Sequence, residues 1–317
     1  MLNLRFVASM FVSGSMVLGA AAVCGQDYPS KPIRIITSGV GGNSDFDARQ
    51  IAQEIAGPLG QPVLVDNRTA LQATELVAKS APDGYNLNVS ATAWIAPLLQ
   101  KVPYDMSELA PISMLETQAN IVIVHPSLPV RSVKELIALA KARPGELNYG
   151  SGATGGSTHL GVELLKSMAG VNIVRIQYKG SGPVIPALIG GEVQLSMQDV
   201  GSVMPQMKIG KLRGLAVTSA QPSALVPGMP TVSASGLPGF EAIGQTGIFA
   251  QARTPTAIIA RLNREIVRFL NRADVKERFL AFGEEIVASS PEQLAATIQS
   301  DVAKWGKLIK EAGIRTD

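Results

Sequence analysis

The chain has 317 residues, of which 46% are hydrophobic and 17% charged, and its formal net charge is +3. This length fits about two globular units, since a domain usually takes ~100–200 residues. The composition excludes a disordered or collagen-like chain, and the small net charge without any Lys/Arg-rich run argues against nucleic acid as a partner.

Residues 1–25 carry the pattern of a secretory signal peptide. Arg5 is the one charged residue there, an apolar run follows over residues 6–23, and polar sequence starts at Gln26. A basic start, an apolar centre and a small-residue end are typical of a cleaved export signal. The alternative is a retained membrane anchor, but serines and glycines dilute this run, and a span needs ~20 mainly apolar residues. We therefore predict that residues 1–25 are removed on export.

Cys24, the only cysteine, lies inside this segment. The mature chain therefore has no disulfide and no thiolate metal site. A lipid anchor on Cys24 is the alternative, but Val23 stands where such sites usually have a small residue.

Beyond the signal, apolar strand-like runs alternate with amphipathic helical stretches, which predicts an α/β fold. We expect helices that begin at Ser132, where an S-x-x-E capping box opens, at Thr254-Pro255 and at Ser290-Pro291. The expected strands are 33–36, 63–65, 87–89, 121–124, 173–176 and 215–217.

Turn-rich stretches at residues 125–129 and 237–240 divide the mature chain. If the chain crosses between two lobes there, the middle third forms one lobe and the two ends form the other. We therefore predict lobe 1 from residues 26–124 plus 241–317 and lobe 2 from residues 125–240.

Two glycine-rich turns each lie between a strand-like run and a helical pattern. The first spans residues 38–45 (SGVGGNSD) and the second spans residues 149–159 (YGSGATGGSTH). Small residues let backbone N–H groups approach a ligand, and the first turn of a helix favours negative charge, so the pair predicts an anion site. The alternative for each is a tight turn in which glycine supplies a positive φ, and neither matches a nucleotide P-loop. Hydroxyl groups that could add donors are those of Ser44, Thr154, Ser157 and Thr158.

Signatures of catalysis and metal binding are weak. His125 precedes a proline at a strand end, where a structural role is expected, and Asp45 at a helix start is expected to be a cap. His159 and Glu163 have i, i+4 spacing, but no third metal ligand is evident. Ser157 and His159 could form a nucleophile and its base in a secreted hydrolase, yet no G-x-S-x-G elbow surrounds the serine. We predict no catalytic residue, no cofactor and no metal.

Two further loops follow predicted strands. Residues 178–183 offer the Tyr178 phenol and the Gly180 amide, and Ser90 with Thr92 follows the third predicted strand. Ligands in open α/β sheets bind at the carboxyl ends of the strands, so both loops are candidates for one cleft. A solvent-exposed turn is the alternative for the tyrosine-containing loop.

A series of short motifs runs through nearly the whole mature chain. They are YPSKPIR at 28–34, DGY at 83–85, VPYD at 102–105, VHPS at 124–127, LNY at 147–149, YKGSGP at 178–183, GKLRGLAVT at 210–218, PTV at 230–232 and AGI at 312–314. Each motif alone is weak, but the ordered set resembles the Bug-type extracytoplasmic solute receptors, the binding subunits of tripartite tricarboxylate transporters.

This resemblance implies a type II-like clamshell of two α/β lobes that closes on a solute, as in periplasmic binding proteins. It implies a monomeric periplasmic receptor for a small dicarboxylate, tricarboxylate or acidic amino acid, with membrane permease subunits as partner. A solute-sensing subunit of a membrane signalling protein would use the same clamshell and is the alternative. The residues assigned to the ligand are Gly41, Gly42, Asn43, Ser44, Ser90, Thr92, Thr154, Gly156, Ser157, Thr158, His159, Tyr178, Gly180 and Asp199.

The chain departs from the family pattern in three places. Its first glycine-rich loop is one residue shorter and has Asn43, where the family usually carries a proline and a longer glycine run. Residues 67–72 read NRTALQ, where the family commonly follows Asn-Arg with Pro-Gly-Ala-Gly-Gly. Gln198 and the Gln245-Thr246 pair stand where aromatic residues are frequent. An amide-lined pocket would suit a small polar acid, and the same changes leave open that binding is altered or lost.

Overall fold

The computed structural model describes residues 28–152, 154–178 and 180–314, so the predicted signal peptide lies outside it. Strands and helices alternate along the chain, which confirms the predicted α/β class. Within these described ranges, no helix combines the length and the apolar character needed to cross a membrane.

The described strands build one mixed sheet with a parallel block at each end. They are β1 (Ile33–Thr37), β2 (Val63–Asn67), β3 (Asn86–Ser90), β4 (Leu109–Val124), β5 (Asn148–Ser151), β6 (Val174–Gln177), β7 (Leu195–Asp199), β8 (Arg213–Val217), β9 (Ile243–Gln251) and β10 (Glu285–Ile286). The order is β2-β1-β3-β9-β4-β7-β5-β6, with β8 and β10 also paired to β4. Strands β1, β2 and β3 are parallel, as are β5, β6 and β7, and the antiparallel strands β4 and β9 join the two blocks.

Helices cover the sheet and begin where capping groups or glycines allow. They are α1 (Asn43–Leu59), α2 (Ala70–Ala78), α3 (Ala96–Leu99), α4 (Val133–Ala142), α5 (Ser157–Ala169), α6 (Val184–Ile189), α7 (Val200–Lys208), α8 (Thr256–Leu270), α9 (Ala273–Phe282) and α10 (Pro291–Glu311). The three predicted helices are thus present as α4, α8 and α10. At α4 the Ser132 hydroxyl accepts the N–H of Glu135, as expected, but the Glu135 carboxylate accepts the N–H of Arg131. The capping box is therefore only half formed.

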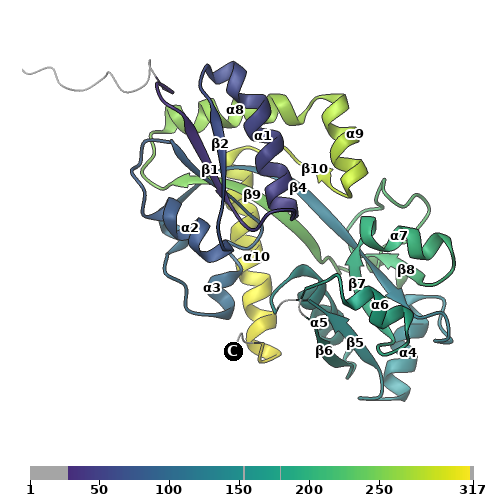
Figure 1. Cartoon of the computed structure of the whole chain (residues 1–317). Helices are drawn as coiled ribbons and strands as arrows, with labels where there is room; N and C mark the ends of the chain where they lie inside the picture. Colours follow the sequence, from purple (N-terminus) through teal and green to yellow (C-terminus); the bar gives the residue numbers. More distant parts are fainter. Residues whose placement is uncertain (1–27, 153, 179, 315–317) are drawn as a thin grey trace, which may run out of the picture.

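Strand β4 links the two parallel blocks of the sheet: it pairs with β9, which borders β1–β3, and with β7 of the other block (Figure 1). Its segment 109–119 pairs with β9, whereas residues 120–124 pair with β7. The sequence predicted only 121–124, because that part is a continuous apolar run. Both of its faces are buried: Ile121 lies in one hydrophobic cluster and Val122 in another. The lobe limits at 26–124 with 241–317 and at 125–240 remain a prediction.

Two helices that start at the carboxyl ends of strands bring their N-termini toward the middle of the molecule. Helix α1 follows β1 and packs through Ile51 and Ile55 against Ile35 of that strand. Helix α5 follows β5, and its Leu160 packs in a cluster with Val122 of β4. Burial of these apolar faces holds each helix, while its first turn stays at the sheet edge where ligands bind in α/β folds.

Candidate functional site

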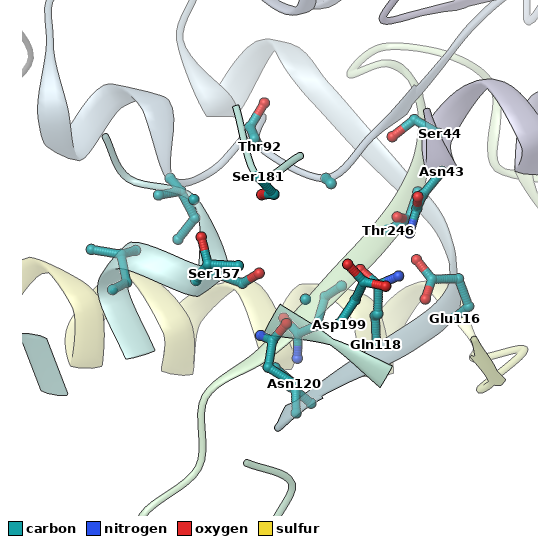
Figure 2. Close-up of a pocket in the computed structure, with 18 of the residues that line it drawn as sticks. Asn43, Ser44, Thr92, Glu116, Gln118, Asn120, Ser157, Ser181, Asp199 and Thr246 are labelled. Carbon is teal, nitrogen blue, oxygen red and sulfur yellow. The ribbon is translucent and has the colours of Figure 1, made fainter. Parts of the chain in front are cut away.

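A cavity of about 610 Å³ lies between these two helix starts. Its wall is formed by β4, β9, the first turns of α1, α5 and α7, the loop after β3, the end of α9 and part of α10. Figure 2 shows Asn43 and Ser44 of α1 across the cavity from Ser157 of α5, with Asn120 and Asp199 below them in this view. The volume falls in the range of ~300–1,000 Å³ that small-molecule sites occupy.

The start of α1 is open toward this cavity. Its N-cap is Gly42, and among the described residues no side chain caps the helix. The first N–H groups of a helix have no partner within the helix, so those of Asn43 and Ser44 are donors at the cavity wall. This end of α1 also carries the positive part of the helix dipole.

Asp45 holds the loop before α1 but does not cap the helix, so the predicted capping role was wrong. Its carboxylate accepts the N–H of Gly41 at 2.9 Å and the Nδ2 of Asn67 at 2.8 Å. Gly41 has φ = 86°, a left-handed conformation that favours glycine. Burial opposes ionisation of Asp45, but hydrogen bonds led by the one from Arg49 bring its pKa below the usual value. The anchor of this loop is therefore a charged carboxylate.

The start of α5 repeats this construction. Its N-cap is Gly156, again without a side-chain cap among the described residues. Gly155 has φ = 83°, and its N–H is 3.1 Å from Nδ1 of His159. Asp45 and His159 are each the third residue of their helix, and each accepts the N–H of the left-handed glycine four residues earlier.

His159 is the neutral counterpart of Asp45. Burial, followed by the charge of Arg175, lowers the pKa of His159 to about 4, so its Nδ1 is an acceptor at neutral pH. Arg175 also holds the loop that precedes α5, because its guanidinium donates to the Thr154 hydroxyl and to the carbonyl of Gly152. With its Nδ1 engaged by Gly155 and its ring 2% exposed, His159 is a loop anchor and not a base for Ser157.

The predicted site residues separate into two groups. The residues that line the cavity are Asn43, Ser44, Thr92, Gly156, Ser157, Thr158 and Asp199. Those that do not line it are Gly41, Gly42, Ser90, Thr154, His159, Tyr178 and Gly180. Ser90 lines a smaller neighbouring cavity of about 80 Å³, and Tyr178 packs against a hydrophobic cluster. Which of these residues touch the ligand remains a prediction.

Strand β4 contributes cavity residues that the sequence analysis missed. Glu116, Gln118 and Asn120 alternate along it and line the cavity (Figure 2). The side-chain Nδ2 of Asn120 is buried without a hydrogen-bond partner among the described residues. Gln198, expected as an amide of the pocket, is absent from the lining, and its Nε2 instead donates to Ser196 at 2.9 Å. The side-chain amides of the cavity therefore come from Gln118 and Asn120 of β4, Gln245 of β9 and Asn43 of α1.

The charged side chains in the described cavity wall are all acidic. Asp199 caps α7, since its carboxylate accepts the N–H and the hydroxyl of Ser202, both at 2.8 Å. Asp301 accepts the indole N–H of Trp94 at 3.1 Å, and burial raises the pKa of this carboxyl group. Glu116 is the third. The cavity wall thus combines the uncapped starts of α1 and α5 with carboxylate oxygens of Glu116, Asp199 and Asp301.

Comparison with known proteins identifies the family. Residues 47–314 match the tripartite tricarboxylate transporter family receptor. This chain belongs to that family. It is 35% identical to Protein BugT of Bordetella pertussis over 99% of each chain. The solved structure of R. palustris Rpa4515 with adipate matches at a TM-score of 0.78 and 32% identity, over 91% of this chain and 99% of that one. MatC of Rhodopseudomonas palustris with bound malate matches at 0.73 and 26% identity, over 89% and 100%.

These matches confirm the predicted family and the predicted periplasmic-binding-protein fold of α/β type. The protein is a periplasmic solute-binding receptor of this family and not an enzyme. Two findings therefore exclude the secreted hydrolase. The family is one of solute receptors, and His159 is buried with its Nδ1 engaged by Gly155.

Proposed function

We propose that this receptor captures a small organic carboxylate in the cavity and delivers it to the membrane permease of a tripartite transporter after export to the periplasm. The observation that carries the proposal is the pair of α1 and α5 N-termini, which lie at one cavity without side-chain caps. The related proteins solved with adipate and malate support a carboxylate as the ligand class.

The donors at the two helix starts supply enough free energy for useful binding. Each helix terminus contributes ~0.3–1 kcal/mol toward an anion, and each charge-assisted hydrogen bond contributes ~1.5–3 kcal/mol. A micromolar dissociation constant requires about 8 kcal/mol, which a few such bonds and the exclusion of water provide. No basic side chain lines the described cavity. Backbone amides and hydroxyl groups such as that of Ser157 would therefore stabilise the negative charge of the ligand by donating hydrogen bonds to it.

The acidic part of the wall narrows the ligand class. Asp199 and Glu116 present acceptor oxygens, which favour a ligand that also carries a donor group. A hydroxyl or ammonium group next to the carboxylates would satisfy them, whereas a third carboxylate there would be repelled. We therefore expect hydroxy- or amino-substituted dicarboxylates to bind better than the unsubstituted acids of equal length.

Thermal unfolding of the mature protein against a carboxylate panel tests this proposal. Co-purified ligand is first removed by unfolding and refolding, and succinate, malate and aspartate are compared with succinamide as the neutral control. A ligand at ~100 times its dissociation constant adds about 2.7 kcal/mol, which raises Tm by several degrees. Equal shifts with succinamide, or no shift with any mono-, di- or tricarboxylate, would contradict carboxylate binding.

A further inference from the structure

Three buried carboxyl groups cluster beside the cavity. Asp47 comes from α1, Glu116 from β4 and Glu284 from the turn between α9 and β10, and their exposed fractions are 0%, 1% and 0%. Carboxylate oxygens of all three lie within 4.8 Å of one another. Segments far apart in the chain thus bring three potential negative charges to one point.

Most of these oxygens have no hydrogen-bond partner. Both oxygens of Asp47, both of Glu284 and Oε2 of Glu116 are buried and unpartnered among the described residues. An unpaired buried carboxylate is costly, so the cluster requires either a cation or bound protons.

We propose that Asp47, Glu116 and Glu284 form a binding site for a divalent cation, with calcium preferred over magnesium. The donors are carboxylate oxygens alone, the ligand type of hard cations. Calcium takes six to eight oxygen ligands in flexible geometry, which suits carboxylate oxygens that three separate segments bring within 4.8 Å of one another. Magnesium needs shorter bonds of about 2.1 Å in near-ideal octahedral geometry.

The position of the site predicts what the cation would do. Glu116 lines the ligand cavity as well as belonging to the cluster, so the cavity gives a cation a path to the site. Bound there, the cation would tie α1 to β4 and to the segment before β10. We therefore expect it to stabilise the fold, whether or not a carboxylate is bound. This inference goes beyond the proposed function; Glu116 belongs to both sites, but calcium binding is measured without any carboxylate, so the failure of one proposal is distinguishable from that of the other.

Metal binding to the refolded protein, dialysed against EDTA and then into metal-free buffer, tests the site directly. We expect calorimetric titration with calcium chloride to give one site per chain and calcium to raise Tm by several degrees, with a smaller rise for magnesium chloride. No saturable calcium binding to the wild-type protein would overturn the proposal, whatever the variants do.

Two charge-removing variants locate the binding. We expect D47N and E284Q each to bind calcium with an affinity at least tenfold lower than that of the wild-type protein. Glu277→Gln, an exposed residue of α9, is the matched control and should retain it. Calcium binding unchanged in both folded variants, or reduced equally in the control, would overturn the site. If the wild-type protein does not bind calcium and Asp47→Asn has a higher Tm than the wild type, the carboxyl groups share protons and the cation site is refuted.

Discussion

The loops that lead into α1 and α5 share a geometry but use opposite chemistry to hold it. Each loop has a left-handed glycine, an extended glycine N-cap and an acceptor at the third helical position. That acceptor is charged Asp45 in one loop and neutral His159 in the other. The start of α7 differs, because Asp199 caps that helix itself. An acceptor placed at the third position satisfies the loop glycine and leaves the first-turn amides free for a ligand.

The largest expected difference between the two loops comes from their left-handed glycines. In either loop alanine at a positive φ costs ~1–2 kcal/mol. At Gly155 the added Cβ would also lie 2.0 Å from Cδ1 of Leu99, whereas nothing lies within 4 Å at Gly41. We expect Gly155→Ala to lose more stability than Gly41→Ala in urea unfolding and to weaken carboxylate binding more than tenfold.

Trimming the contacting side chain provides the control. The double variant Leu99→Ala/Gly155→Ala should recover binding toward that of the Gly41→Ala protein, because the steric part of the penalty is removed. Equal losses in the two single variants would show that the Leu99 contact does not matter.

The second test removes the charged anchor. Asp45→Ala removes the acceptor of two part-buried hydrogen bonds, from the N–H of Gly41 and the Nδ2 of Asn67, and a hydrogen bond to a charged group is worth ~1.5–3 kcal/mol. Asp45→Asn keeps one acceptor oxygen and should lose less. Chemical denaturation measures both losses, and an Asp45→Ala protein as stable as the wild type would refute the anchoring role.

Acid should weaken the α5 loop before the α1 loop. The pKa of His159 is about 4 in the folded protein, below its unfolded value of ~6.5, so the unfolded chain binds more protons between these values. The stability that neutral His159 contributes is therefore present above pH 6.5 and lost as the pH falls toward 4. The charged groups that act on the ring are Arg175, Glu163 and Lys166. Asp45 has a lowered pKa, so its contribution is lost only below ~3.8.

His159→Gln isolates this effect, since glutamine offers an acceptor that does not titrate. Unfolding free energies of the two proteins should diverge between pH 6.5 and pH 4, with the wild type losing more. Parallel pH profiles would mean that His159 is not held neutral by the fold.

The smallest expected effects come from the hydroxyl groups at the two helix starts. Ser157→Ala and Ser44→Ala each remove one donor at the cavity wall, worth ~0.5–1.5 kcal/mol, or about two- to twelvefold in affinity. Tm without ligand should not change. Titration calorimetry on each folded variant checks this, and unchanged affinity would remove that hydroxyl from the site.

The sequence predicted the elements whose pattern is local and missed those that depend on packing. Apolar runs identified six strands, whereas β5 has the sequence Asn-Tyr-Gly-Ser and carries no such run. The polar half of β4 was missed for the same reason, although the alternation of Glu116, Gln118 and Asn120 is a period-two signal. With that half of the strand unassigned, the cavity amides of Gln118 and Asn120 were not found.

Glycine and helix signals coincide in the sequence at the starts of α1 and α5. Both helix starts were expected at the ligand, and both line the cavity. His159 was expected either to order its loop or to bind the ligand; it does not line the cavity, and its Nδ1 accepts the N–H of Gly155 in that loop. No sequence pattern predicts the carboxylate cluster, since only tertiary packing brings Asp47, Glu116 and Glu284 together.

In the proposed function, one carboxylate ligand contacts the starts of α1 and α5 at the same time. Backbone amide NMR of the refolded, ligand-free protein, titrated with the carboxylate that gives the largest thermal shift, tests it most directly. We predict that the amide signals of Asn43 and Ser44 and those of Ser157 and Thr158 shift together, with a single dissociation constant. Shifts confined to one loop, or different constants for the two loops, would contradict a shared site.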